Sequence, residues 1–519
     1  MRWLNFFISH RARFKNLNRI GMKIIPISYQ DAARKKNIFL SLFQKEPLAN
    51  ESIFPHLSLT HKETVKKLWQ EEFKGEEGET KSAWFPQGPI KRIRLFGLGE
   101  KTKWNFRKEH LLPRNYVRYA KGERITEFAT SMPALENEAK KEAAARFSAN
   151  AILANFEFNK YKEKPKDGWP EVKTVYLATD NKSLGEVKKG VWEGIIIGEE
   201  TNFCRDLANT PGGDMTPSIL AEAAKKTGKR TKIKVKILDE KEMKKLGMGG
   251  ILGVAKGSDE KPKFIILEYK KGPRKQKPLV LVGKGITFDT GGLNLKTENS
   301  IYEMHMDMSG GGAVLAGMAA IARLGIKINV IGLIPAVENM PSGSSYHPGD
   351  LLKTMSGKTI EVLNTDAEGR IALSDALTFG LKYNPGFIID FATLTGAAHV
   401  ALGNYCSAAF TNKEKLQNNL VEIGKKSGDY VWPLPLWDEY LSEIKGTFGD
   451  ISNIAKGDRW GGAIHGAKFL EQFIGNTPWA HIDIAPRMTT VDGEYLAKGA
   501  SGVGVRYIVE LAKNYSEFV

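Results

Sequence analysis

A series of short, almost uninterrupted apolar runs recurs along the C-terminal part of the chain, separated by segments with helical apolar spacing. The runs lie at 233–238, 264–268, 279–282, 328–333 and 387–391. Continuous apolar runs of this length are typical of strands that are covered on both faces, as in sheets built largely from parallel strands. The sequence therefore predicts an α/β fold with a mixed, mainly parallel sheet and helices on both faces.

A smaller α/β domain is predicted ahead of this one, because short strand-like runs there alternate with helical patterns. The strand-like runs lie at 24–27, 92–96 and 174–178, and the strongest helical pattern covers 134–155. A chain of 519 residues with 42% hydrophobic residues can bury more than one core. We expect an N-terminal α/β domain at 22–180, an interdomain helix at 181–209 and a larger C-terminal domain at 210–519.

Residues 1–21 form a basic extension that is left outside the predicted fold. The segment carries arginines and a lysine but no acid. One interpretation is a transit-like amphipathic segment. The other is that Met22 is the true start, because Met22–Ser28 opens like the first strand of a domain.

One stretch, Val362–Leu373, places Asp366, Glu368 and Arg370 at alternate positions, where a β-branched run gives way to a helical pattern. In an open α/β sheet, ligands collect at the carboxyl ends of strands, and helix N-termini contribute N–H groups there. Chemistry at this junction is one hypothesis. The other is that Asp366 caps the helix and Glu368 sits in its first turn, where carboxylates are favoured in any case.

A second stretch, Leu279–Lys296, is a buried-strand run that ends in glycines and carries Lys284, Asp289 and Lys296. Asp307 follows just before Gly310-Gly-Gly312 and a helix predicted to start near Ala313. Divalent cations take carboxylate oxygens, and a lysine can ligate a metal once it has lost its proton. The carboxylates and lysines of the two stretches together suggest a site for two metal ions.

These motifs together resemble the M17 leucyl aminopeptidase family. The resemblance rests on VGKGITFDTGG, Lys296, Asp307 and NTDAEGR, and it extends to four further segments. Those segments are CRDLANTPGGDMTP (204–217), ENMPSG (338–343), ATLTGA (392–397) and WAHIDIA (479–485). It is nearly continuous from about residue 190 and thin before that, where only FEFNKYK (156–162) matches.

The resemblance implies a metal-dependent aminopeptidase that releases leucine and other N-terminal residues by attack of a hydroxide bridging two metals. It implies five metal ligands: Lys284, Asp289, Asp307, Asp366 and Glu368. It makes Lys296 and Arg370 catalytic, the former stabilising the oxyanion and the latter holding a bicarbonate ion as general base. It places five residues at the substrate site: Met304, Thr393, Leu394, Gly396 and Ala485.

The resemblance also implies the cofactors and partners of the chain. Two divalent ions per subunit are expected, Mn²⁺ or Zn²⁺, with Mg²⁺ or Co²⁺ as alternatives, together with bicarbonate. The substrates would be peptides with a free N-terminus, because the amino group ligates a metal, and the assembly would be a homohexamer. The chain departs from the family pattern at Thr290, at the glycine-rich Ser309–Gly312 and over the longer segment 487–498, and none of these positions is itself a proposed ligand.

Composition adds a second hypothesis, a nucleic-acid-binding accessory role on the same scaffold. The net charge is +17, and so basic a chain can bind nucleic acid or an anionic surface. The densest basic cluster, at 270–277, also fits a solvated hairpin loop because it carries glycine and two prolines. A third hypothesis, a two-metal phosphohydrolase, lacks the histidine and asparagine ligands common in that class.

The cellular setting is predicted from cysteine usage and apolar run length. The chain has two cysteines, too few for a disulfide framework. No run approaches the ~18 consecutive apolar residues of a membrane span. We therefore expect a cytoplasmic protein without a membrane partner. The histidines have no ligand-motif spacing such as His-Glu-x-x-His, so we expect them to be structural or to lie near the substrate.

Overall fold

The structure is a computed structural model that describes residues 21–133, 138–457 and 460–519. Its chain divides into two compact units, one made of residues 1–155 and 161–195 and the other of 156–160 and 196–519. The long helix α6 (Leu184–Asn209) belongs to the first unit up to Ile195 and to the second from Ile196. The predicted extension lies outside the described residues except for Gly21.

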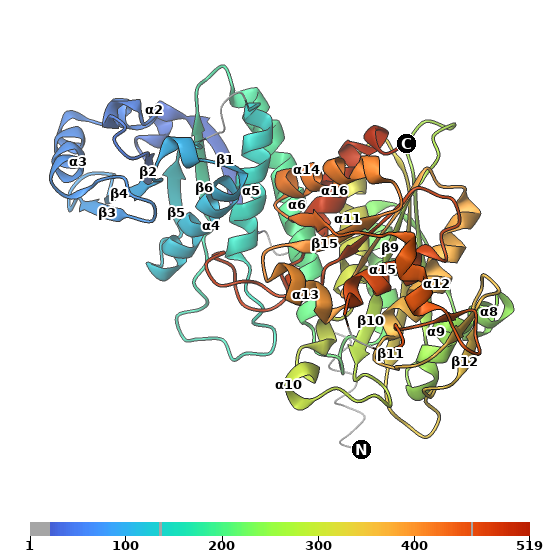
Figure 1. Cartoon of the computed structure of the whole chain (residues 1–519). Coiled ribbons are helices and arrows are strands. Elements are labelled where there is room, and N and C mark those ends of the chain that lie inside the picture. The colour runs from blue at the N-terminus through green and yellow to red at the C-terminus, as the bar shows by residue number, and fades with distance from the viewer. Residues whose placement is uncertain (1–20, 134–137, 458–459) are drawn as a thin grey trace. The chain divides into compact units, whose positions relative to one another are not determined.

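The first unit contains a six-stranded sheet in the order β1-β6-β5-β2-β4-β3 (Figure 1). All neighbouring strands pair in parallel except β3, which pairs antiparallel with β4. The strands are β1 (Lys23–Ser28), β2 (Asn37–Leu42), β3 (Thr80–Trp84), β4 (Arg92–Gly97), β5 (Glu127–Thr130) and β6 (Thr174–Thr179). The main helices are α3 (Leu59–Glu72), α4 (Phe106–Gly122) and α5 (Lys140–Asn155).

The predicted helix at 134–155 begins later than its apolar pattern indicated. It appears as α5, which starts at Lys140, and residues 134–137 lie outside the described part of the chain. Phe39 of β2 stacks on Phe128 of β5 with ring centroids 4.3 Å apart, and Phe96 meets Tyr116 of α4 at 4.6 Å. These rings pack the strands of this sheet against α4.

The second unit is built on a nine-stranded sheet in the order β16-β15-β18-β14-β9-β11-β8-β7, with β10 paired to β11. Most neighbours are parallel, and the antiparallel pairs are β15–β18, β11–β8 and β7–β8. The strands are β7 (Lys234–Leu238), β8 (Lys263–Lys270), β9 (Leu279–Gly283), β10 (Gly285–Asp289), β11 (Asn329–Asn339), β14 (Phe387–Ala392), β15 (Ser407–Thr411), β16 (Val431–Pro433) and β18 (Trp479–Asp483). The predicted fold class, α/β with a mixed, mainly parallel sheet, is confirmed.

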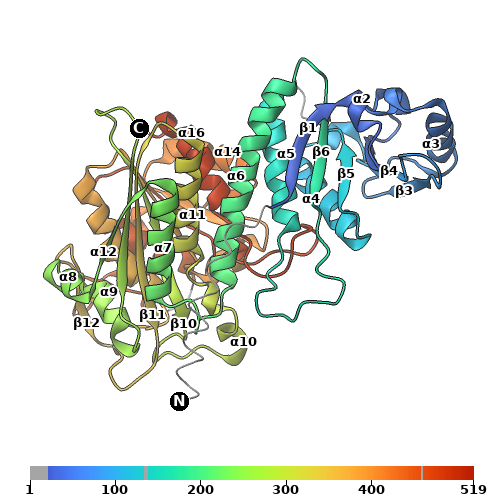
Figure 2. The ribbon, with the colours of Figure 1, turned by 180° about the vertical axis from the view of Figure 1, so that it is seen from behind.

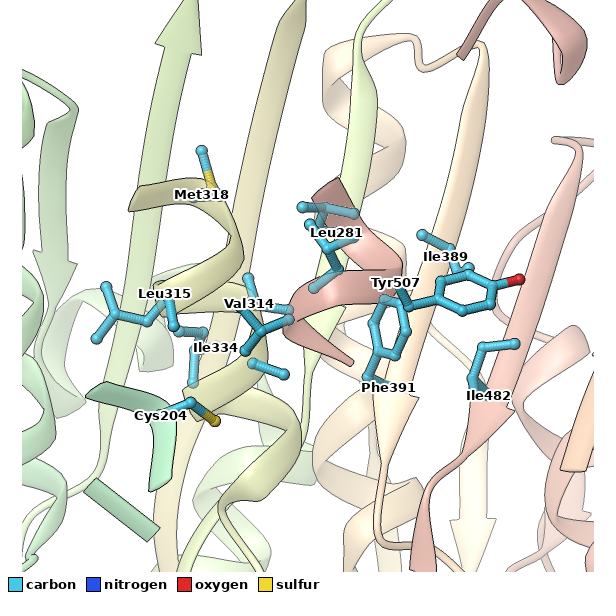
Figure 3. Packing of buried hydrophobic residues seen from close by; sticks show 14 of the residues in the cluster. Cys204, Leu281, Val314, Leu315, Met318, Ile334, Ile389, Phe391, Ile482 and Tyr507 are labelled. Atoms are coloured by element: carbon cyan, nitrogen blue, oxygen red, sulfur yellow. The ribbon is translucent and has the colours of Figure 1, made fainter. Parts of the chain in front are cut away.

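Helices cover both faces of this sheet, as the two opposite views show (Figures 1 and 2). One layer consists of α7 (Pro217–Thr231), α11 (Ser309–Leu324), α14 (Gln417–Ser427) and α16 (Val505–Lys513). The other consists of α9 (Gly249–Val254), α12 (Glu368–Gly380) and α15 (Gly462–Glu471). In the first layer, Val314 and Leu315 of α11 and Tyr507 of α16 pack against buried strand residues such as Leu281 and Phe391 (Figure 3).

Two local predictions are wrong. Helix α11 begins at Ser309 rather than near Ala313, so Gly310-Gly-Gly312 lies inside it. A Cβ at Gly310 would come within 2.0 Å of the Phe391 carbonyl oxygen, so glycine there lets the helix approach the sheet. The basic loop after β8 is not a hairpin, because β11 lies between β8 and β9 in the sheet.

A small three-stranded sheet includes the strand that lies directly before the loop 362–367, which contains Asp366. It joins β12 (Leu351–Lys353), β13 (Thr359–Glu361) and β17 (Ile451–Ser452). The chain then runs from β13 through 362–367 into α12. No helix in the described part of the chain is long and apolar enough to cross a membrane.

Candidate metal centre

The predicted ligands meet at the carboxyl ends of β9, β10 and β14 and at the start of α12. Carboxylate oxygens of Asp289, Asp366 and Glu368 all lie within 4.8 Å of one another. Asp307 joins them through Lys284, whose Nζ lies 2.9 Å from Asp307 Oδ2 and 2.8 Å from Glu368 Oε1. All five sequence-predicted ligands therefore occupy one site.

Lys284 follows β9 directly and is held there by its own backbone. Its N–H donates to the Phe391 carbonyl (3.0 Å), and its carbonyl accepts from the Gly311 N–H (2.6 Å). Its side chain is 4% exposed, and Nζ donates to the Thr393 carbonyl at 3.0 Å. A Cβ at position 369 would lie 2.5 Å from Lys284 Cε, so Gly369 leaves the space through which this side chain passes.

Asp289 and Lys296 come together across a glycine turn. Gly291 and Gly292 have positive φ angles of 86° and 64°, a conformation that favours glycine. The turn brings the Lys296 N–H to the Thr290 carbonyl at 2.9 Å. The Lys296 Nζ then lies 2.9 Å from Asp289 Oδ2 and also pairs with Asp366 Oδ1. The predicted catalytic lysine therefore lies between two predicted ligands.

The structure decides against the capping interpretation of Asp366. Helix α12 starts at Glu368, its N-cap is Ala367, and no side chain donates or accepts a capping hydrogen bond there. Glu368 lies in the first turn, as both hypotheses required. Asp366 instead faces Lys296, with 34% of its side chain exposed. This placement favours the hypothesis of chemistry at the junction.

The charges of the site are poorly balanced without cations. Four buried or half-buried carboxylates face two lysine ammonium groups. Burial and the neighbouring Asp289 raise the pKa of Glu368 to about 8, and burial raises the pKa of Asp307 to about 6. Burial alone would lower the pKa of Lys284, but Asp307, Glu368 and Asp289 raise it overall. A raised carboxyl pKa means that the anionic form is destabilised, because nearby positive charges and hydrogen bonds do not make up for its burial.

The donor set fits divalent metal ions. Glu368 Oε2 is buried and has no hydrogen-bond partner among the described residues. Carboxylate oxygens are preferred ligands of Mg²⁺ and Mn²⁺ and are also bound by Zn²⁺. Lys284 would ligate only as the neutral amine, so metal binding there requires loss of its proton. Cations at this position would offset the charge of the acidic cluster.

Arg370 lies in the first turn of α12 and is buried. Its NH1 donates to the Asn453 carbonyl at 2.7 Å, and its Nε has no partner among the described residues. Burial lowers its pKa to about 10. A Cβ at position 466 of α15 would lie 3.3 Å from Arg370 NH2, so Gly466 provides room for the guanidinium.

The residues predicted to line the substrate site lie beside the cluster. Thr393 Oγ1 donates to Asp307 Oδ1 at 2.5 Å. Met304 is half-buried and its carbonyl accepts from the Asp307 N–H. Leu394, the exposed Gly396 and Ala485 follow the carboxyl ends of β14 and β18, which are neighbours in the sheet. Thr393 and Met304 therefore contact the proposed ligand Asp307 directly, and Leu394 and Gly396 follow Thr393 in the chain.

Sequence reasoning missed the polar residues that support the ligands. Asn339 at the end of β11 donates from Nδ2 to Asp289 Oδ1 (2.8 Å) and to the Thr365 carbonyl (3.0 Å). Asn453 is fully buried, and its Oδ1 accepts from the Leu363 N–H at 2.8 Å. Asp483 at the end of β18 accepts from the loop after β14. A lone polar residue at the end of an apolar strand run was the available signal.

Among the described residues, no histidine joins the three-carboxylate group. His481 is fully buried in β18, where its Nδ1 lies 2.6 Å from Asp390 Oδ1. His465 of α15 pairs with Glu443 at 2.6 Å, while His347 and His399 are exposed. A cavity of about 440 Å³ in this unit also shares no residue with the cluster. It lies at the β7–β8 edge of the sheet and is lined by Lys234, Lys236, Leu238, Glu242, Lys245, Leu246, Ile266, Glu268, Phe379 and Tyr383.

The fold and the site together define an α/β protein with a largely buried carboxylate–lysine cluster suited to metal ions, and comparison with known proteins assigns its family. Residues 202–509 match the model of the cytosol aminopeptidase family, catalytic domain, and residues 40–165 match the N-terminal domain of the same family. The chain belongs to this family, M17, whose members are metal-dependent hydrolases. Membership supports aminopeptidase activity.

The relatives include bacterial proteins of similar length. A protein of Chlorobaculum tepidum named "Probable cytosol aminopeptidase" is 45% identical over 393 residues, which cover 74% of this chain and 78% of the relative. One of the same name from Roseiflexus castenholzii is 40% identical, covering 83% and 89%. The solved structure of the bottromycin maturation enzyme BotP in complex with Mn matches with a TM-score of 0.81 and 26% identity, covering 93% of this chain and 99% of that chain.

Proposed function

We propose that this protein is a dinuclear metalloaminopeptidase that releases leucine and other N-terminal residues from peptides with a free amino group. The observation that carries the proposal is the cluster of the buried Asp289 and Glu368 with the partly exposed Asp366, whose oxygens lie within 4.8 Å of one another. Lys284 and Asp307 complete the five proposed ligands of two metal ions. The structural relative BotP was solved in complex with Mn, which supports Mn²⁺ as one of the ions, beside Zn²⁺, with Mg²⁺ and Co²⁺ as alternatives.

Two divalent ions held by these five residues would activate water at neutral pH and polarise the scissile carbonyl. The protein's own part is to hold the ligands rigidly and to exclude bulk water from them. Asp289 is fixed by Asn339 and by the Gly291 N–H, and Asp307 by Thr393. Ligands fixed in this way need little reorganisation when the ions bind.

Lys296 is proposed to stabilise negative charge on the substrate carbonyl. Its ammonium group is held at the cluster by Asp289 and Asp366, and these carboxylates raise its pKa although burial alone would lower it. A preorganised cation in a water-poor site is worth about 10²- to 10³-fold in rate. Because the pKa is raised, Lys296 keeps its charge at neutral pH.

Arg370 is proposed to bind bicarbonate as the general base. A guanidinium matches a planar anion with two parallel hydrogen bonds, which a lysine cannot provide. Its Nε is unpaired within the described structure, while NH1 is engaged by Asn453. The base would take a proton from the attacking water and deliver it to the leaving amine.

The proposal is tested with amino-acid anilides that differ only at the amino group. Leucyl anilide should be hydrolysed and its N-acetyl form should not, because an acetylated nitrogen has no lone pair available for a metal. A panel of other aminoacyl anilides then measures the preference for leucine. Hydrolysis of acetyl-leucyl anilide at a comparable rate would refute an aminopeptidase mechanism.

We also propose that the protein forms a homohexamer in the cytoplasm.

A nucleic-acid-binding role is a second prediction. The basic loop between β8 and β9 is exposed at Lys270, Lys271, Arg274, Lys275 and Lys277. If it binds phosphates, affinity for duplex DNA should fall with salt at a slope of about −0.9 per contact. Absence of DNA retardation at about 50 mM salt would remove this role.

A further inference from the structure

The side chain of Asp483 links the residues that follow β14 to the residues that follow β18, and both segments carry predicted substrate-site residues. Asp483 ends β18 and is fully buried. Its Oδ1 accepts from the Leu394 N–H at 3.1 Å and from the Ala485 N–H at 3.2 Å. One carboxylate oxygen therefore fixes the backbone at two positions that lie 91 residues apart in sequence and were predicted to line the substrate site.

The second carboxylate oxygen of Asp483 binds the residue that caps α13 (Gly396–Leu402). Asp483 Oδ2 accepts from the Thr395 hydroxyl at 2.7 Å. The same Thr395 oxygen accepts from the Ala398 N–H at 3.1 Å and so caps α13. Because the hydroxyl has one hydrogen, its donation to Asp483 orients the oxygen lone pairs toward the helix. Asp483 thereby fixes the start of α13 as well as the loop before it.

Asp483 holds the backbone of two residues whose side chains are partly exposed. Leu394 and Ala485 are each partly exposed, while Asp483 beneath them has no exposure to solvent. A buried carboxylate that accepts three hydrogen bonds is rigid, because leaving any of these donors unpaired costs free energy. The positions of the two side chains thus depend on one buried group.

We propose that Asp483 is a positioning residue that sets the wall of the substrate side-chain pocket by holding Leu394, Thr395 and Ala485 together. The proposal rests on the proposed function for the identity of the pocket. Within the described structure Asp483 has no hydrogen bond or ion pair with the ligand carboxylates, and its charge also acts on Arg370, where burial is the larger influence on the pKa. An effect through Arg370 is common to all substrates, so a change in the choice between substrates reports the wall. Loss of Asp483 should alter which N-terminal side chains are accepted, with the metal ligands left in place.

The test compares Asp483→Asn with a matched buried acid. In Asp483→Asn the amide oxygen can still accept from Leu394 and Ala485, but the amide nitrogen cannot accept the Thr395 hydroxyl hydrogen. Asp390→Asn is the control, because Asp390 is equally buried on the neighbouring strand and its carboxylate bonds Trp479 and His481 instead of the pocket wall. Thr395→Val should reproduce the Asp483→Asn effect, and the double variant should be no worse than either single one.

Two readouts separate positioning from general destabilisation. We expect the ratio of kcat/KM for leucyl over alanyl anilide to fall about tenfold in Asp483→Asn, because a displaced wall affects the larger side chain more. Bound metal per subunit should be unchanged. Equal losses for both substrates, or the same shift in Asp390→Asn, would overturn the proposal.

Amide hydrogen exchange tests the clamp without relying on activity. Peptides that cover 393–398 and 484–487 should exchange faster in Asp483→Ala, which removes every acceptor oxygen, than in wild type or Asp390→Ala. Unchanged exchange in both peptides would overturn the positioning role. If wild-type protein hydrolyses no anilide, the proposed function fails, and the exchange result still decides whether Asp483 holds the two segments together.

Discussion

At the scale of single residues, the site is organised by two lysines that each bridge two acids. Lys284 pairs with Asp307 and Glu368, and Lys296 pairs with Asp289 and Asp366. Removing a buried partner from such a pair leaves a charge uncompensated, which is costly. Metal ions bound at the carboxylates would supply the missing positive charge, with Lys284 losing its proton and Lys296 keeping its own.

Asp366→Ala and Arg370→Ala should fail in different ways, although the residues lie four apart. Loss of Asp366 removes a ligand oxygen, so metal content and activity should fall together, and excess metal should restore part of the rate. Loss of Arg370 leaves every ligand in place, so metal content should stay normal while kcat falls about 10²- to 10⁴-fold. Elemental analysis beside kcat measures both effects.

Arg370→Lys is the matched control for this prediction. Lysine keeps the positive charge but lacks the planar fork, so the dependence of the rate on bicarbonate should be lost as in Arg370→Ala. If Arg370→Ala loses metal as Asp366→Ala does, Arg370 supports the ligand shell and the two residues do not have separate roles.

The ligands were predictable from sequence and their supports were not. Charged residues stand out in apolar or glycine-rich motifs, so Asp289 and Glu368 could be chosen from the pattern. Asn339 and Asn453 act through hydrogen bonds between segments far apart in the chain. The place of Asn339 at the end of an apolar run singles it out, but no local pattern identifies its partners. Gly369 is similar, because its role depends on the path of Lys284.

At the scale of elements, continuous apolar runs located five of the nine strands of the large sheet, within one or two residues at most ends, and did not locate β10, β15, β16 and β18. Strand β11 was underestimated, because it continues to Asn339 beyond the run that ends at Leu333. The start of α11 was misplaced because three glycines normally interrupt a helix, whereas here they permit close packing on Phe391. Strand order could not be predicted, since β11 crosses between β8 and β9.

A buried acid in the smaller sheet domain gives a pH prediction. Glu51 accepts from the Ile53 and Phe54 N–H groups and from the Ser131 hydroxyl, and burial raises its pKa from 4.5 to about 7. The folded state thus binds this proton more tightly than the unfolded state. Its contribution to stability is full below about pH 4.5 and is lost as pH rises to about 7, by up to about 3 kcal/mol.

Glu51→Gln should remove that loss, because the amide mimics the protonated acid and can keep the same partners. Urea unfolding between pH 4 and 8 measures the change, with exposed Glu71→Gln in α3 as the control. If the free energy of unfolding depends on pH equally in wild type and Glu51→Gln, ionisation of the buried Glu51 does not destabilise the folded state.

At the scale of the whole molecule, exposed aromatic side chains support assembly. Trp432, Trp437, Phe448 and Trp460 are 57%, 65%, 81% and 81% exposed in the second unit. These side chains are the candidate subunit contacts of the proposed hexamer. We expect light scattering at micromolar concentration to give the mass of a hexamer, and a monomer would refute this prediction.

Trp437→Glu should shift the mass toward smaller species if these aromatic side chains lie in subunit contacts. Trp84→Glu is the control, because Trp84 is 61% exposed but belongs to the other unit. A hexamer that is unchanged in Trp437→Glu would place the contacts elsewhere on the molecule.

The central claim is that the carboxylate–lysine cluster binds two metal ions that activity requires. The most direct measurement is a titration of chelator-stripped protein with Mn²⁺ or Zn²⁺, following leucyl anilide hydrolysis and bound metal in the same samples. We predict that the stripped protein is inactive and that activity reaches its plateau at two ions per subunit, with Asp366→Ala binding the metals more weakly. Full activity in the stripped protein, or binding unaffected by loss of Asp366, would contradict the claim.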